Sequence, residues 1–129
     1  MKISELAHAS NVPAKTIRYY EQIKLISAAE RDSNGYRSYQ RQDIATLVFI
    51  RRCRELNIAI DDIKQLLDIQ ATPAAPCSTV DDIIARQLAK IKQKQRELAL
   101  LETSLSELAT SCVNHKIEDC SILHQLRAG

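Results

Sequence analysis

A heptad pattern between residues 80 and 111 constrains this chain more than any other feature of its sequence. One apolar seam consists of Ile84, Ile91, Leu98 and Leu105, and a second of Val80, Leu88, Leu101 and Leu108. The stretch contains no glycine or proline. It therefore predicts a long helix whose apolar stripe needs a covering surface, and we expect an antiparallel coiled coil with a second copy of the chain. Packing of this helix on its own domain is the alternative, but little chain remains to cover so long a stripe.

Cysteines bracket the predicted helix, with Cys77 before it and Cys112 and Cys120 after it. A helix over residues 80–111 spans ~48 Å at 1.5 Å per residue, so Cys77 and Cys112 of one chain cannot meet while the helix is straight. In an antiparallel dimer the start of one helix lies beside the end of the other. The sequence therefore predicts a three-thiol site that is shared across a dimer interface.

The composition is that of a soluble protein with one small domain and an extension: 129 residues, 45% hydrophobic and 26% charged. No signal peptide opens the chain and no apolar run reaches transmembrane length, so we expect a cytoplasmic protein without a membrane partner. Thiols stay reduced there, which favours cysteines as ligands or core residues over disulfides. With two glycines, a phosphate-cradling loop is excluded, and no nucleophile–base arrangement indicates an enzyme.

Charge is divided unevenly along the chain. Residues 1–60 contain ten Lys/Arg and six Asp/Glu, whereas residues 61–129 contain eight and ten. All four tyrosines also lie within the first forty residues. A basic, tyrosine-bearing first half suits contact with a polyanion such as nucleic acid.

The first forty residues predict a winged helix-turn-helix. Two short helices are expected around Asn11 and Pro13, a left-handed position and a helix breaker, and the second runs to about Ile23. The Asn34-Gly35 pair then predicts a turn between short extended flanks that carry arginine and tyrosine, although a solvated loop is the simpler alternative. The candidate DNA-binding residues are Lys15, Thr16, Arg18, Tyr19, Tyr20, Arg31, Tyr36, Arg37 and Tyr39.

The rest of the chain is divided by its breakers and apolar spacing. Helices are expected from about Arg41 to Leu56 and from Asp61 or Asp62 onward. Cys53 lies in an apolar pattern and is expected to be a buried structural thiol. A last short helix, 121–127, is expected to point Ile122, Leu123 and Leu126 inward. We therefore divide the chain into a DNA-binding domain (1–70), a hinge with Cys77 (71–79), a dimerisation helix (80–111) and a metal-binding loop with a short helix (112–129).

Several of these motifs resemble the metal-responsive MerR-type transcriptional regulators over essentially the whole chain. The resemblance is carried by Thr16-Ile17-Arg18-Tyr19-Tyr20-Glu21, by Arg31…Gly35-Tyr36-Arg37-Ser38-Tyr39, by residues 49–56 and by the cysteine-bracketed helix. It implies an all-α fold with a small β wing and a homodimer joined by an antiparallel coiled coil. It also implies that the dimer binds double-stranded promoter DNA and distorts it when the inducer binds, so that RNA polymerase can use the promoter.

The cysteine pattern most resembles the lead-, cadmium- and mercury-sensing branch of this family. Soft thiolates select such ions, zinc or Cu(I) over hard cations. The copper-sensing branch shares the Cys112-x7-Cys120 loop but has serine at the position of Cys77. The zinc-sensing branch has a second loop cysteine where this chain has Val113. His115 is an additional candidate ligand or a solvated loop residue, and a Cu(I) sensor or a thiol-based metal buffer without DNA binding remains an alternative.

Overall fold

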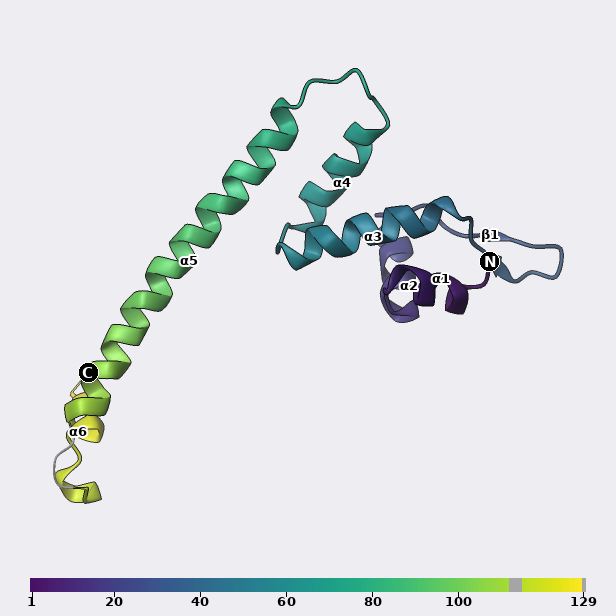
Figure 1. Cartoon of the computed structure of the whole chain (residues 1–129). Helices are drawn as coiled ribbons and strands as arrows, with labels where there is room; N and C mark the ends of the chain where they lie inside the picture. The colour runs from purple at the N-terminus through teal and green to yellow at the C-terminus, as the bar shows by residue number, and fades with distance from the viewer. Residues whose placement is uncertain (112–114, 129) are drawn as a thin grey trace. The chain divides into compact units, whose positions relative to one another are not determined.

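The computed structural model of this protein describes residues 1–111 and 115–128. Its first helices are α1 (Ile3–Ser10) and α2 (Ala14–Gln22), followed by the strands β1 (Glu30–Arg31) and β2 (Arg37–Ser38). Four further helical elements and one 3-10 turn complete the chain: α3 (Gln42–Glu55), α4 (Ile60–Gln70), α5 (Ser78–Ser111), η1 (Ile117–Asp119) and α6 (Ser121–Arg127). The expectation of a mainly helical fold with a small β element is confirmed (Figure 1).

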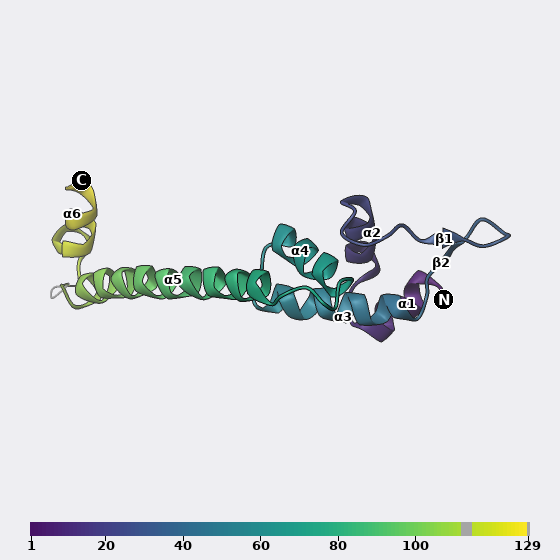
Figure 2. The ribbon, with the colours of Figure 1, turned by 90° about the horizontal axis from the view of Figure 1, so that it is seen from above.

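The chain forms two compact units, Met1–Ile83 and Ile84–Gly129. The boundary falls inside α5, whose first turns belong to the first unit. The helix itself continues through the boundary without a break (Figure 2). The two compact units do not coincide with the four segments predicted from the sequence, which are bounded at residues 70, 79 and 111. Those segments remain a prediction of which part of the chain performs which function.

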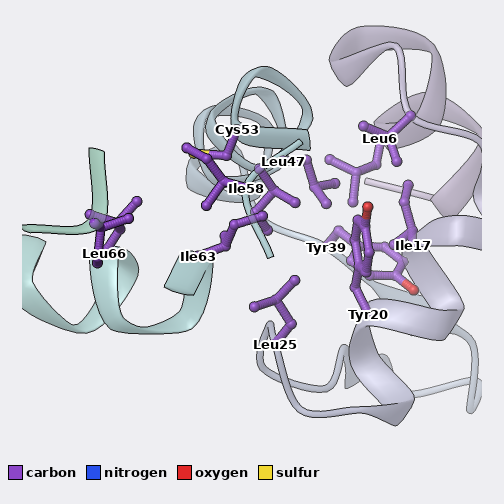
Figure 3. Packing of buried hydrophobic residues seen from close by; sticks show 13 residues of the cluster. Leu6, Ile17, Tyr20, Leu25, Tyr39, Leu47, Cys53, Ile58, Ile63 and Leu66 are labelled. Carbon is purple, nitrogen blue, oxygen red and sulfur yellow. The ribbon is translucent and has the colours of Figure 1, made fainter. Parts of the chain in front are cut away.

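One hydrophobic core holds the first unit together. Leu6 of α1, Ile17 of α2, Leu47 of α3 and Ile63 of α4 are completely buried in it. Figure 3 shows the side chains of these helices converging on this cluster, with Tyr20 and Tyr39 among them. Each helix contributes its apolar face at three- or four-residue spacing, so the amphipathic pattern in the sequence determines how the four helices pack.

Two asparagines end helices in the left-handed conformation, as the sequence predicts. Asn11 follows α1 with φ of 57°, and its backbone N–H donates to Ala7 O. Asn57 follows the end of α3 with φ of 59°. Asparagine tolerates this conformation better than most residues with a Cβ, so each turn forms without a glycine.

The wing is a hairpin of two antiparallel two-residue strands, in which Arg31 pairs with Arg37. Its tip is a turn closed by Gly35 N–H donating to Asp32 O at 3.0 Å, and Gly35 then takes φ of 82°. The Asp32 carboxylate also accepts the N–H groups of Asn34 and Tyr36. Asn34 is therefore inside the turn and Gly35 supplies the left-handed residue that a three-residue hairpin loop needs. Both ribbon views show the hairpin extending beyond the helices of its unit (Figure 1, Figure 2).

Helix α5 has little of its surface covered within the single chain. Ile83, which is not part of the heptad pattern, is 1% exposed and packs in the core of the first unit. The seam residues Ile84, Leu88, Leu98, Leu101 and Leu105 are all exposed. The apolar stripe predicted from the sequence is thus present on the helix, and no other described segment of this chain buries those five side chains.

The expectation for the last helix is correct in extent but wrong in burial. Helix α6 covers Ser121–Arg127 as predicted, and Ile122 is half-buried. Leu123 and Leu126, expected to point inward, are 40% and 66% exposed. The second unit offers few other described elements for α6 to pack against, so apolar spacing alone overstated its burial.

No helix in the described part of the chain is both long enough and apolar enough to cross a membrane. The long helix α5 reaches the required length but carries charged residues in every turn of its middle section. Its exposed apolar side chains therefore form a stripe along one side of the helix and not a continuous apolar cylinder.

We predict that Ile83→Ala lowers the free energy of unfolding by about 2–5 kcal/mol, because it removes a fully packed side chain from the first unit's core. Leu100→Ala provides the matched control on the same helix, since Leu100 is 70% exposed and off the seam. That change should stay within about 0.5 kcal/mol. Urea unfolding followed by circular dichroism measures both. Equal effects of the two substitutions would contradict the packing of α5 described above.

Candidate nucleic-acid interface and thiol residues

Helix α2 separates its buried and exposed residues cleanly. Ile17 is completely buried, whereas Lys15, Arg18 and Tyr19 are exposed. Residues three and four positions apart share one side of a helix, so these three side chains lie together on the solvent side. Thr16 is half-buried at the edge of this side. The exposed face of α2 therefore presents two cations and a phenol, groups that pair with phosphates and hydrogen-bond to base edges.

The four predicted tyrosines fall into two pairs. Tyr19 and Tyr36 are 51% and 72% exposed, whereas Tyr20 and Tyr39 are buried in the core. Burial raises the pKa of Tyr20, with the nearby Arg54 charge acting in the opposite direction. The structure thus places Tyr20 and Tyr39 where they support the helix and the wing, and leaves Tyr19 and Tyr36 accessible to a partner.

The wing places its two arginines in different surroundings. Arg31 donates through Nη1 to the carbonyl oxygen of Gly35 at 2.8 Å, which holds its side chain against the wing tip. Arg37 Nη1 lies 3.5 Å from Glu21 Oε2 at the end of α2. The side chain of Arg37 is 42% exposed, so its guanidinium still reaches solvent. Both arginines retain donors that a phosphate can accept.

Tyr39 anchors the base of the wing. Its backbone N–H donates to Met1 O at 2.8 Å, and the Met1 amino group donates to Tyr39 O at 3.1 Å. Burial, together with the adjacent Glu21 carboxylate, raises the pKa of Tyr39 to about 12, although the Arg37 charge opposes this shift. The Tyr39 hydroxyl and Glu21 Oε1 are both buried, and neither has a hydrogen bond of good geometry among the described residues.

A groove of about 810 Å³ lies between the start of α1 and the wing. Arg18, Tyr36 and Arg37 all line it, so residues selected separately from α2 and from the wing face one hollow. Lys2 and Ser4 line it as well, although neither belongs to the predicted set of DNA-binding residues. A single lysine ahead of the first helix belongs to no motif, and only the folded arrangement brings it to this surface.

The thiols differ in accessibility. Cys77, just before α5, is exposed, and its carbonyl oxygen accepts the Asp81 N–H in the first turn of that helix. Cys120, just before α6, is partly exposed. Cys53 is buried, and burial raises the pKa of its thiol, which agrees with the structural role expected for it. The third predicted ligand, Cys112, lies outside the described residues, as does Val113.

The segment that leads to Cys120 is closed by hydrogen bonds between serines. The Ser121 hydroxyl lies 2.7 Å from Ser111 O and 2.9 Å from Ser111 Oγ. This contact joins the end of α5 to the start of α6, directly beside Cys120. His115 is exposed in a left-handed conformation with φ of 54°. Among the described residues, no three His, Cys, Asp or Glu side chains cluster as a metal site within the single chain.

The Tyr39 environment can be tested by titration. We predict that the absorbance at 295 nm shows a tyrosine step near pH 12 that is lost in Tyr39→Phe and retained in Tyr36→Phe. Because the folded pKa is raised above 10.0, the stabilising contribution is complete below pH 10 and is lost as the pH rises toward 12. A titration in which Tyr39→Phe removes no late step would show that Tyr39 is not buried beside Glu21.

Comparison with known proteins identifies two matching families along the chain. Residues 1–69 match the MerR HTH family regulatory protein, and residues 44–108 match the family described as MerR, DNA binding. Together the two matches span the helix-turn-helix, the wing and most of α5. The resemblance expected from the sequence motifs is thereby confirmed at the level of the family.

Individual relatives cover the chain nearly end to end. The HTH-type transcriptional regulator HmrR of Rhizobium leguminosarum bv. viciae is 39% identical over 129 residues, covering 100% of this chain and 99% of that protein. The crystal structure of the transcription regulator PbrR691 from Ralstonia metallidurans CH34, in complex with lead(II), has a TM-score of 0.88 at 32% identity and 98% coverage of both chains. The mercury(II) complex of MerR from Bacillus megaterium MB1 has a TM-score of 0.75 at 32% identity, covering 98% of this chain and 99% of that one.

Proposed function

This chain belongs to the MerR family of helix-turn-helix regulatory proteins, and we propose that within this family it is a metal-sensing transcriptional activator. It acts as a homodimer that binds double-stranded promoter DNA and distorts it when a soft divalent ion binds, so that RNA polymerase can use the promoter. Cadmium, lead or mercury is the preferred inducer, with zinc as a further candidate. The observation that carries the proposal is the exposed Cys77 thiol at the start of α5.

The chemistry of the thiols fits such an ion. The Cys77 thiol is exposed and Cys120 is partly exposed, whereas the buried Cys53 has a raised pKa and is a poor thiolate. We assign Cys77 of one chain, with Cys112 and Cys120 of its partner, as the ligands. When bound, the ion supplies strong thiolate bonds that join the start of one α5 to the end of the other. Relatives whose structures contain lead(II) and mercury(II) support this choice of ion.

The exposed seam of α5 supports the homodimer. Five apolar residues of the heptad pattern face solvent in the single chain, and a row of this kind is stable when a complementary surface covers it. A second copy supplies the same row in reverse order. In that arrangement the start of each α5 approaches the end of the other, as the shared thiol site requires.

DNA contacts are assigned to the exposed side of α2 and to the wing. Lys15, Arg18 and Tyr19 face the major groove from α2, and Arg31, Tyr36 and Arg37 hold the phosphate backbone. Bending a DNA site costs of order 1–6 kcal/mol, so the activator needs several backbone anchors on a rigid support. The buried Tyr20 and Tyr39, together with the half-buried Thr16, take supporting positions next to these contacts.

A Cu(I) sensor of the same family is the second candidate. The Cys112-x7-Cys120 spacing favours it, because two thiolates suit linear Cu(I). The divalent-ion hypothesis requires Cys77 as a ligand and the Cu(I) hypothesis does not. A third thiolate adds the negative charge and coordination number that divalent ions favour. A metal buffer without DNA binding is disfavoured by the wing and by the exposed cations of α2.

We predict that Ile91→Asp combined with Leu98→Asp yields monomers that lose operator binding, because a charge in each seam position prevents the coiled coil from forming. Ala89→Asp combined with Leu100→Asp adds the same charge to exposed positions off the seam and should leave the dimer intact. Sedimentation velocity measures the oligomeric state. Dimers that persist in the seam variant would refute this role of the helix.

We predict that metal binding is restored when two inactive variants are mixed. A Cys77→Ser chain paired with a Cys112→Ser/Cys120→Ser chain regenerates one complete three-thiol site, although neither homodimer has one. Only the heterodimer should then show the thiolate-to-metal charge-transfer band with cadmium or lead at near-native affinity. Binding should weaken as the pH falls because protons compete for the thiolates. Cys53→Ser, which leaves the three candidate ligands in place, is the control.

In-vitro transcription from the bound promoter completes this test. Cadmium or lead should raise transcription strongly while DNA affinity changes little, since the inducer reshapes bound DNA and does not release it. If Cys77→Ser keeps its response to cadmium or lead and a response to Cu(I) persists or grows, the divalent assignment is wrong and the Cu(I) reading replaces it.

A further inference from the structure

We propose that Glu21 is a positioning residue, whose carboxylate holds Arg37 of the wing in the orientation in which its guanidinium meets a DNA phosphate. This proposal rests on the DNA binding proposed above. It assigns a function to an anionic residue on the helix that carries the exposed cations Lys15 and Arg18.

Glu21 is a nearly buried carboxylate beside a residue that is proposed to bind DNA. Its side chain is 8% exposed, at the end of the same helix that carries Arg18 and Tyr19, and Oε2 lies 3.5 Å from Arg37 Nη1. A buried carboxylate is costly unless a charged partner or hydrogen-bond donors accompany it. Arg37 is the ion-pair partner of this carboxylate and Tyr39 lies beside it, so Glu21 and Arg37 restrict each other.

The wing needs this restriction. A two-strand hairpin is marginally stable alone, and each strand here has two residues. Tyr39 fixes its base by the backbone bonds to Met1. The ion pair between Arg37 and Glu21 is a second attachment of the wing, because it joins β2 to α2. An arginine held in this way has less side-chain entropy to lose when it binds.

Arg37 is much more exposed than Glu21, so only Arg37 can also contact DNA. Glu21 is enclosed, whereas the Arg37 side chain is 42% exposed. A guanidinium has five N–H donors, and its contact with one carboxylate oxygen leaves others directed elsewhere. Arg37 also lines the groove with Arg18 and Tyr36. Arg37 can therefore keep its contact with Glu21 and donate to a phosphate at the same time.

The opposite role makes a different prediction. If Glu21 competed with phosphate for Arg37, its removal would free the arginine and tighten DNA binding. If Glu21 positions Arg37, removing Glu21 lowers DNA affinity. Arg37 then contributes less to that affinity than it does in the wild-type protein. A double-substitution cycle on the full-length protein separates the two cases.

The cycle compares wild type, Glu21→Gln, Arg37→Gln and the double variant on a duplex that the wild-type protein selects from a random-sequence pool. Affinity is measured over a series of salt concentrations. We expect Arg37→Gln to weaken binding several-fold and to reduce the magnitude of the salt slope by about 0.9, the value for one phosphate. Glu21→Gln should produce most of both effects, and the double variant should add little to either.

Glu30→Gln is the matched control. It removes the same charge from an exposed position on β1 of the same wing, and lower repulsion alone should leave binding equal or slightly tighter. Titration at 295 nm tests whether the Glu21 carboxylate lies beside Tyr39 in solution, because its loss should lower the pKa of Tyr39. If Glu21→Gln is poorly folded by circular dichroism, Glu21→Asp, with the carboxylate withdrawn by one methylene, should still reduce the slope.

Tighter binding by Glu21→Gln, or additive losses in the double variant, would overturn the positioning role. A salt slope that stays at the wild-type value in both Glu21 variants would do the same. If the wild-type protein enriches no duplex from the pool, the proposed DNA binding is wrong, and the proposed role of Glu21 is wrong with it. The first results leave DNA binding intact, so the two failures are distinguishable.

Discussion

The structure depends on a disparity between the apolar stripe of α5 and the surface that one chain provides to cover it. The helix has 34 residues, and among them only Ile83 is buried. An isolated helix gains little from its own hydrogen bonds in water, so its stability comes from covering its apolar face. The first unit supplies such a cover for the first turns alone. The remaining stripe is the physical basis for the proposed pairing of two chains, and the two units of one chain therefore differ in how far each can be stable without a partner.

Local chemistry allowed much of this fold to be predicted from the sequence. Asn11 and Asn57 end helices because asparagine accepts the left-handed conformation, and both have positive φ values. The Asn34-Gly35 pair marked the wing turn, which the structure contains. Cys53 was expected in the core from its position in an apolar pattern and is buried there. Each of these features depends on a few neighbouring residues, which is why one sequence suffices to find them.

The features that the sequence did not reveal involve residues far apart in the chain. Ile83 lies beside the seam residue Ile84 and resembles it chemically, but only the folded first unit decides which of the two is buried. Tyr39 and Glu21 lie side by side because the chain returns from β2 to the end of α2. No pattern of neighbouring residues predicts this contact. Leu123 and Leu126 show the converse, since apolar spacing predicts burial even where the described chain has nothing to cover it. The grouping of the three candidate thiols remains a prediction, because it requires a second chain.

The hydrogen bonds of the wing tip also bear on the chemical stability of Asn34. An Asn-Gly pair is prone to deamidation, in which the backbone nitrogen of glycine attacks the asparagine side-chain amide and expels ammonia. Water then opens the resulting succinimide and leaves a carboxylate. Here the Gly35 N–H is donated to Asp32 O, and the Asn34 N–H to the Asp32 carboxylate, so the turn restrains both residues. A new negative charge at this position would lie in the same hairpin as Arg31 and Arg37. The turn that shapes the wing thus also slows a spontaneous chemical change that would reduce its positive charge.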